Sequence, residues 1–75
     1  MKLPVIKPRE AIKAFQKAGW YIDHQTGSHV IMCHQDNRPT TLSIPRHERD
    51  MPKGLLSGLI KDAGLTYEQF TELLS

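Results

Sequence analysis

The histidines and the single cysteine are the side chains of this sequence that most readily exchange protons or bind metal ions. The segment QTGSHVIMCHQ, residues 25–35, places His29 directly after a Thr-Gly-Ser turn signal and places Cys33 and His34 side by side. Histidine titrates near neutral pH and is a common general acid or base, and both histidine and cysteine are common zinc ligands. Three interpretations follow: a metal site, a catalytic base at the end of a hairpin, or a strand that happens to contain histidine.

A metal site is disfavoured by the spacing of these side chains. Structural zinc sites usually combine two ligand pairs with spacings such as C-x2-C and H-x3-H, and the sequence contains no such combination. In an extended strand, His29 and Cys33 share a face but lie about 13 Å apart, which is too far to hold one ion together. We therefore predict no metal and no other cofactor.

An acid–base role for His29 is chemically simple, because cleavage of RNA needs no nucleophile from the protein. The 2′-hydroxyl already lies beside the phosphorus, so the protein supplies a base, an acid, and positive charge or N–H groups for the phosphate. His29 follows Gly27 and Ser28, whose backbone N–H groups can face a phosphate that the glycine allows to approach closely. The alternative is a strand-end histidine that hydrogen-bonds to His24 or to the turn. We expect His24 and His34 to be solvated.

Basic side chains outside the hairpin are further candidates for phosphate contacts. Lys7, Arg46, Arg49 and Lys53 are either solvated surface residues or contacts to an RNA backbone beside the hairpin. His47, in PRHERD, contacts phosphate, orients a partner side chain, or does neither. The residues by themselves leave these alternatives open.

Length and composition restrict the class of protein. A chain of 75 residues can bury one modest core, so we predict a single domain over residues 1–75. One cysteine cannot form an intramolecular disulfide, and the N-terminal residues lack the apolar run of a signal peptide, so we expect a cytoplasmic protein that is not associated with a membrane. The net charge of +2 and the pI of about 8.9 allow nucleic-acid binding without requiring it, because the lysines and arginines are dispersed.

The sequence patterns predict a helix followed by a β-hairpin. Pro8 is typical of a first helical residue, and Gly19 favours a left-handed helix end. The apolar face between them consists of Ala11, Ile12, Phe15 and Ala18. In residues 20–24, WYIDH, the side chains of Trp20, Ile22 and His24 alternate with the other two, as in a strand. Residues 28–34, SHVIMCH, form the second strand.

The register of this hairpin determines which side chains reach the core. We take Thr26 and Gly27 as the two central residues of the turn. His24 then pairs with His29. The side chains expected to face the helices are Trp20, Ile22, Ile31 and Cys33. Those expected to face outward are Tyr21, Asp23, Val30, Met32 and His34.

A third strand and a second helix follow. Turn-forming residues 35–39 lead to a strand at residues 40–44, TTLSI, with Leu42 and Ile44 inward. Pro52 begins a helix that ends at Gly64. Its apolar stripe consists of Leu55, Leu56, Leu59, Ile60 and Ala63.

A short last helix completes the predicted fold. Thr66 and Gln69 form a capping-box pattern at its start. Its buried side consists of Phe70, Leu73 and Leu74. The order α-β-β-β-α plus a short C-terminal helix predicts an α+β fold with a three-stranded antiparallel sheet and helices on one face. Double-stranded-RNA-binding domains have this order of elements, although a fold does not dictate a function.

Four motifs together resemble a known family. The runs KPREAIKAFQKAGW, GSHVIM, IPRH and MPKGLLSGLIKDAGLTYEQFTELL follow one another as in the small HicA (YcfA-like) toxins of HicA–HicB toxin–antitoxin modules, over residues 7–74. Gly-Ser-His alone is weak evidence, but its combination with Pro-x-His and the Pro-Lys-Gly helix at these separations is specific. Two positions depart from the family pattern: Leu55 stands where threonine is common, and Trp20 where phenylalanine is usual.

The resemblance implies an mRNA interferase, an endoribonuclease toxin with a fold like that of double-stranded-RNA-binding domains. It implies that His29 is the catalytic residue, that no bound metal takes part, and that a HicB-type antitoxin covers the face around His29. The residues expected to contact RNA are Gly27, Ser28, Lys7, Arg46, His47 and Lys53. The alternative function is a non-catalytic module that binds duplex RNA by shape and phosphate contact. Such modules typically carry a lysine cluster at the start of the last helix, where MPKGLLSG has only Lys53.

Overall fold

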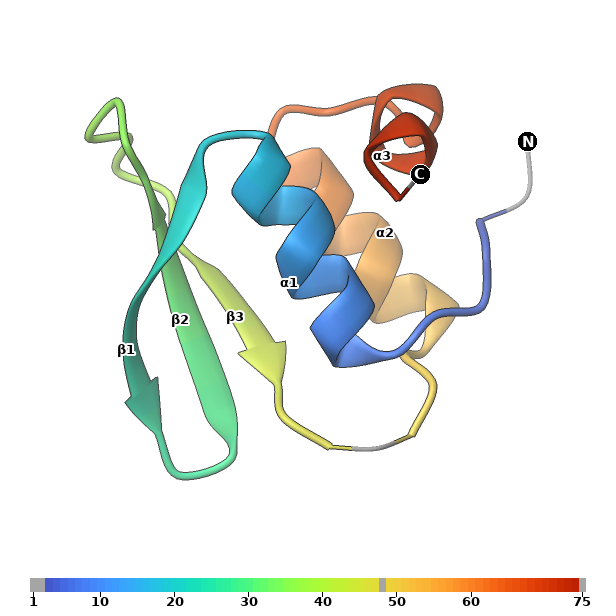
Figure 1. Ribbon diagram of the computed structural model, residues 1–75, viewed down its shortest axis with the longest axis horizontal. Helices are drawn as coiled ribbons and strands as arrows, with labels where there is room; N and C mark the ends of the chain where they lie inside the picture. Colours follow the sequence, from blue (N-terminus) through green and yellow to red (C-terminus); the bar gives the residue numbers. More distant parts are fainter. Residues whose placement is uncertain (1–2, 48, 75) are drawn as a thin grey trace.

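The elements follow one another in the predicted order of one helix, three strands and two helices. The computed structural model describes residues 3–47 and 49–74 (Figure 1). The elements are α1 (Pro8–Lys17), β1 (Trp20–Thr26), β2 (His29–His34), β3 (Leu42–Pro45), α2 (Lys53–Asp62) and α3 (Tyr67–Leu73). The strands form one antiparallel sheet in the order β1-β2-β3, so the prediction of an α+β fold with a three-stranded meander is confirmed.

The helix ends lie close to where the sequence predicts them. Pro8 is the first residue of α1, and the Glu10 carboxylate accepts a hydrogen bond from the backbone N–H of Lys7 at 3.1 Å. This bond satisfies an N–H group at the start of the helix and fixes the backbone of Lys7. The chain leaves α1 through Gly19, whose φ of +96° is a left-handed conformation that costs glycine little. The reciprocal capping box predicted for α3 is present.

The turn between β1 and β2 lies one residue later than predicted. Thr26 pairs with His29, so Gly27 and Ser28 are the central residues, and the predicted Thr26-Gly27 turn is wrong. Gly27 has a φ of +48°, and a positive φ at the first central residue is the geometry that glycine favours in type II′ turns. The predicted pairing of His24 with His29 is also wrong, because His24 pairs two residues further along β2.

A β-bulge in β1 changes the face to which its side chains point. The pairing shifts between Ile22 and His24, which leaves Asp23 as the extra residue. Trp20 and Ile22 therefore lie on the helix-facing side, whereas His24 lies on the other side. The sequence prediction assumed uninterrupted alternation over residues 20–24, and for that reason it grouped His24 with Trp20 and Ile22.

The two faces predicted for β2 are reversed. Val30 and Met32 are buried, whereas Ile31 and Cys33 are only half-buried on the opposite face. The predictions that Ile31 and Cys33 belong to the core and that Val30 and Met32 face outward are therefore wrong. The physical reason is the bulge: side chains alternate along a strand, and the one-residue shift of pairing at Asp23 places Trp20 and Ile22 on the face of Met32 and His34.

His34 belongs to the core, which contradicts the prediction that it is solvated. Its side chain is 4% exposed. The ring Nε2 donates to the Ala18 carbonyl oxygen at 3.0 Å, and Nδ1 accepts from the backbone N–H of Asp36 at 3.1 Å, a pattern that fits a neutral ring. The ring also packs edge-on against Trp20, with the centroids 5.1 Å apart. His34 therefore joins the end of α1 to the end of β2.

One hydrophobic core lies between the sheet and the helices. Phe15 of α1 and Phe70 of α3 are fully buried and contact each other, with ring centroids 5.1 Å apart. Leu42 and Ile44 of β3 are buried as predicted, although this strand begins at Leu42 and not at residue 40. The predicted stripe of α2 is buried except for Leu55, which is 36% exposed and outside the core.

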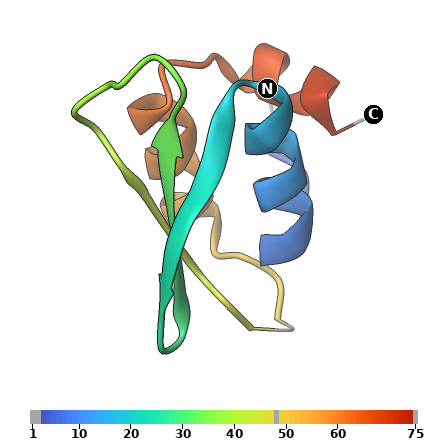
Figure 2. The ribbon, with the colours of Figure 1, turned by 60° about the vertical axis from the view of Figure 1, so that its left-hand side comes forward.

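All three helices cover one side of the sheet, and we call the uncovered side the open face (Figure 1). Its side chains are Tyr21, His24, Thr26, His29, Ile31, Cys33 and Ser43. The β1–β2 turn projects beyond the start of α1 (Figure 2), and the histidines nearest the turn are exposed. Within the described ranges, no helix has the length and apolar character needed to cross a membrane.

Candidate functional site

His29 is the first residue of β2 and lies on the open face at the projecting end of the hairpin. It pairs with Thr26 of β1 and with Pro45 of β3, so two neighbouring strands fix its backbone. Its side chain is exposed, and its Nδ1 lies 3.3 Å from the hydroxyl oxygen of Ser28. The ring is thus held on one side by its neighbour in the chain, while the other side faces solvent.

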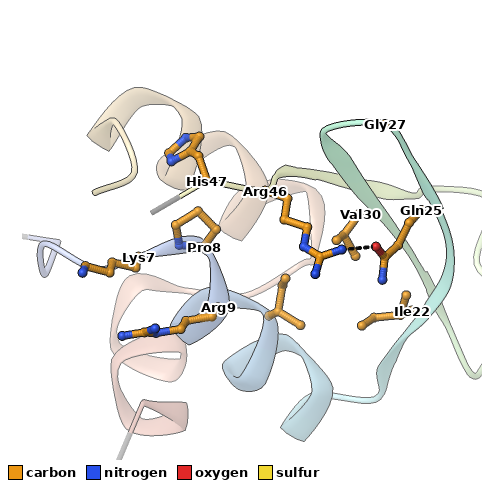
Figure 3. A pocket seen from close by; sticks show the side chains of 10 residues that line it. Lys7, Pro8, Arg9, Ile22, Gln25, Gly27, Val30, Arg46 and His47 are labelled. Carbon is orange, nitrogen blue, oxygen red and sulfur yellow. Dashed lines mark hydrogen bonds between the residues drawn. The ribbon is translucent and has the colours of Figure 1, made fainter. Parts of the chain in front are cut away.

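A groove of about 660 Å³ lies on the other side of the same hairpin, between the start of α1 and the helix-facing side of β1 and β2 (Figure 3). The residues that line it are Lys7, Pro8, Arg9, Ile12, Ile22, Gln25, Gly27, Val30, Arg46 and His47. Ile22 is 39% exposed because it borders this groove, so the prediction that Ile22 is a buried core residue is wrong. The groove therefore has an apolar floor and a basic rim.

The charge of the groove is positive. Lys7, Arg9 and Arg46 contribute permanent cations, and none of the ten lining residues is an aspartate or a glutamate. Lys7 and Arg9 flank Pro8, so the first turn of α1 delivers both to the same rim. A cluster of cations of this kind attracts anions, and phosphate groups of nucleic acids are typical partners of lysine and arginine.

Arg46 connects the groove to the turn. Its backbone N–H donates a hydrogen bond to the carbonyl oxygen of Ser28 at 2.6 Å. Its guanidinium donates to the side-chain oxygen of Gln25, as the dashed line in Figure 3 shows. The next residue, His47, accepts a hydrogen bond at Nδ1 from the backbone N–H of Arg49 at 3.1 Å. Both the backbone and the side chain of Arg46 are therefore hydrogen-bonded to the β1–β2 hairpin.

The structure brings some of the predicted site residues together and separates others. Lys7, Gly27, Arg46 and His47 all line the groove. Ser28 lies in the turn beside it, and His29 lies on the open face of the same hairpin end. Lys53 is the exposed first residue of α2 and is not among the lining residues. A sugar–phosphate backbone that crosses the hairpin end would contact first the groove and then His29.

Two polar lining residues were not predicted from the sequence. Arg9 follows the helix-starting proline, and this position could have suggested that its side chain shares a rim with Lys7. Gln25 carries no such signal, because its inward orientation depends on the bulge. Among the residues that the structure describes, no three His, Cys, Asp or Glu side chains are grouped so that they could hold a metal ion.

Most of the chain matches a known protein family. A family model described as "HicA toxin of bacterial toxin-antitoxin" matches residues 8–65 of the 75-residue chain. The matched range contains all three strands, the basic groove except for Lys7, and His29. A search of curated proteins found no match.

Proposed function

This chain belongs to the HicA toxin family of bacterial toxin–antitoxin modules, and on this premise we propose that it is an mRNA interferase that cleaves RNA through His29. The observation that carries the proposal is the meeting of two features at one hairpin end. A groove with three cations and no carboxylate lies on one side, and an exposed imidazole lies on the other. Phosphate binding and proton transfer are the two tasks that RNA cleavage requires of a protein.

The groove supplies the contacts to the RNA backbone. Lys7, Arg9 and Arg46 bind phosphates, and His47 adds a polar contact at the end of the same rim. Gly27 is fully open, since a Cβ atom placed there would meet nothing within 4 Å, so the RNA backbone can cross the turn closely. Ser28 and Lys53 are weaker candidates for RNA contacts, because both lie outside the lining of the groove.

His29 performs the proton transfer. Its Nδ1 lies beside the Ser28 hydroxyl, so its Nε2 is the atom directed toward substrate. In the neutral state Nε2 removes the proton of the 2′-hydroxyl, and in the protonated state it donates a proton to the leaving oxygen. Neither step uses a metal ion, so the proposed cleavage persists when divalent cations are chelated.

The test is incubation of purified protein with end-labelled RNA in excess EDTA. We expect the parent to shorten the RNA and to leave 2′,3′-cyclic phosphate ends, because the 2′-oxygen is the nucleophile. The His29→Gln variant should be slower by about 10²–10⁴-fold. Ser43→Ala, which changes another exposed residue of the open face, is the matched control and should keep the parent rate.

Three outcomes would contradict parts of this proposal. Full activity of His29→Gln would remove His29 from the mechanism, and loss of parent activity in EDTA would require a metal ion. Steeply salt-dependent RNA binding without any shortening of the RNA would identify a non-catalytic RNA-binding module instead.

The proposed partner is a HicB-type antitoxin that covers the open face around His29. Membership of a toxin–antitoxin family supports an antitoxin partner. Tyr21 is 45% exposed, and Ile31 and Cys33 are half-buried, so apolar surface surrounds the polar hairpin end. Apolar surface on one side of the hairpin end and a charged groove on the other suit a protein inhibitor that combines hydrophobic contact with acidic side chains.

A further inference from the structure

We propose that His24 is the second proton-transfer group of the RNA cleavage, acting with His29 as an acid–base pair on the open face. This inference rests on the proposed ribonuclease function and extends it. Cleavage by the 2′-hydroxyl needs a base for the nucleophile and an acid for the leaving oxygen, and one histidine supplies only one of them at a time. A second ionisable group is therefore needed near His29.

The pairing of the strands makes His24 and His29 diagonal neighbours. His29 lies opposite Thr26, and His24 lies opposite Ile31, which is two residues beyond His29 on the same face of β2. Diagonal neighbours on one face of an antiparallel pair are about 7–8 Å apart at the backbone, within reach of long side chains. This spacing leaves room for one phosphate group between the two rings.

The β-bulge is the feature that places His24 on this face. With uninterrupted alternation, His24 would share a face with Trp20, whose side chain is buried against the helices. The extra residue, Asp23, reverses the alternation, so Trp20 faces the core and His24 faces the side of His29. Bulges often re-aim side chains in this way beside active sites.

Each of the two rings is held through its Nδ1 atom by the residue that precedes it. The Nδ1 atom of His24 lies 2.7 Å from a carboxylate oxygen of Asp23, and that of His29 lies 3.3 Å from the Ser28 hydroxyl. No described residue hydrogen-bonds to Nε2 of either ring. The Asp23 carboxylate accepts the Nδ1 proton of His24 in both states of the ring, so Nε2 is the atom that gains and loses a proton.

The two rings differ in the group that holds Nδ1, which is a carboxylate for His24 and a hydroxyl for His29. We assign the protonated, donating role to His24 and the accepting role to His29. The 2′-hydroxyl proton moves to Nε2 of His29 while the 2′-oxygen forms a bond to phosphorus. The bond from phosphorus to the 5′-oxygen breaks, its electron pair stays on that oxygen, and Nε2–H of His24 supplies the proton. The products are a 2′,3′-cyclic phosphate and a 5′-hydroxyl, and the two rings have exchanged protonation states.

The surroundings contain few other groups that titrate. The three strands carry no lysine, arginine or glutamate. The other ionisable side chains of the hairpin outside the core are Asp23, Tyr21 and Cys33. Arg46 follows β3 but directs its guanidinium to Gln25 on the helix-facing side. The pH dependence of the rate is therefore expected to report chiefly on the two histidines.

The test compares His24→Gln, His29→Gln and the control Ser43→Ala on two substrates. One is an ordinary labelled RNA, and the other carries sulfur in place of the 5′-oxygen at the mapped cleavage position. A thiolate leaves without protonation, so it does not need the acid. His24→Gln should lose about 10²–10⁴-fold in kcat on ordinary RNA and only about tenfold or less on the sulfur substrate. His29→Gln should be slow on both, and circular dichroism should show all variants folded.

The pH profiles provide an independent readout. The parent rate should follow a bell-shaped curve, because the base must be neutral and the acid protonated. His24→Gln should lose the decline at high pH, and His29→Gln the decline at low pH. Asp23→Asn, which keeps the shape of the side chain, should slow the parent less than His24→Gln does. It should have no further effect when His24 is already replaced.

The outcomes separate the two proposals. If His29→Gln is inactive and His24→Gln matches Ser43→Ala, the role of His24 is wrong and the ribonuclease proposal stands. Equal losses of His24→Gln on both substrates would also overturn the acid role. If His29→Gln is fully active while His24→Gln shows the expected pattern, the assignment of His29 fails and that of His24 holds. A parent protein that cleaves no RNA would overturn both proposals.

Discussion

The backbone N–H of Arg46 and the carbonyl oxygen of Ser28 form a hydrogen bond of 2.6 Å. Ser28 precedes His29, and Arg46 lines the basic groove, so this bond ties the two halves of the proposed site together. In the proposed cleavage, a phosphate bound by Arg46 is thereby kept close to a fixed position relative to His29. Fixed positioning of this kind is what converts binding into a productive geometry.

Replacing Arg46 should weaken RNA binding through the loss of one phosphate contact. We expect Arg46→Ala to reduce the magnitude of the slope of log K against log salt by about 0.7–1. Lys61→Ala is the matched control, because Lys61 is an exposed cation in the last turn of α2 and does not line the groove. Fluorescence anisotropy at several salt concentrations measures both slopes. Equal effects of the two substitutions would mean that RNA binds diffusely and not in the groove.

Gly19 should be far less tolerant of alanine than Gly58. Gly19 has a φ of +96°, and a Cβ atom there would lie 2.8 Å from Nε2 of His34. We expect Gly19→Ala to cost about 1–3 kcal/mol of unfolding free energy, with further loss if His34 moves. Gly58 lies within α2 in open space, so Gly58→Ala should stabilise the protein by about 0.5–1 kcal/mol. Urea unfolding of the two variants checks the opposite signs.

The buried and the exposed histidines should differ in their effects on stability. His34→Ala removes hydrogen bonds to Ala18 and Asp36 and leaves a cavity beside Trp20, so we expect a loss of about 2–4 kcal/mol. His24→Gln changes a side chain that is 53% exposed, and its unfolding free energy should stay within about 0.5 kcal/mol of the parent. Thermal unfolding followed by circular dichroism distinguishes them. Similar losses for both would contradict the described environment of His34.

The position of the antitoxin can be checked through Cys33. This residue is the only cysteine of the chain and lies half-buried on the open face. A cysteine-free antitoxin that covers this face should slow the reaction of Cys33 with a thiol reagent, whereas one that covers only the groove should leave the rate unchanged. Mass spectrometry of the labelled toxin, alone and in the complex, measures the difference.

The order of the elements could be predicted from sequence because it depends on local signals. Pro8 and Gly19 mark the ends of α1 through their own backbone preferences, and the capping box at α3 acts within one turn of helix. Leu42 and Ile44 alternate with polar residues, so the inward face of β3 was also evident. Each of these features involves residues close in the chain.

The pairing and the faces of the hairpin could not be predicted with the same ease, because they depend on a turn and a bulge that compete with simple alternation. The turn sets which residues pair, and glycine followed by serine was a better turn signal than threonine followed by glycine. In β2 the apolar run Val30–Cys33 fits either face, so the bulge in β1 decides which face is buried. The bulge at Asp23 left no compositional mark. The relation of His24 to His29 and the inward position of Gln25 both depend on it.

The bulge at Asp23 also links the number of residues in β1 to the way in which the strand pairs. If every residue of β1 paired regularly, Trp20 and His24 would lie four positions apart and on the same face, so the strand could keep either Trp20 in the core or His24 on the open face, but not both. Removing Asp23 would leave the two residues three positions apart in a regular ladder, each on its present face. β1 is therefore expected to lose its bulge only together with one residue.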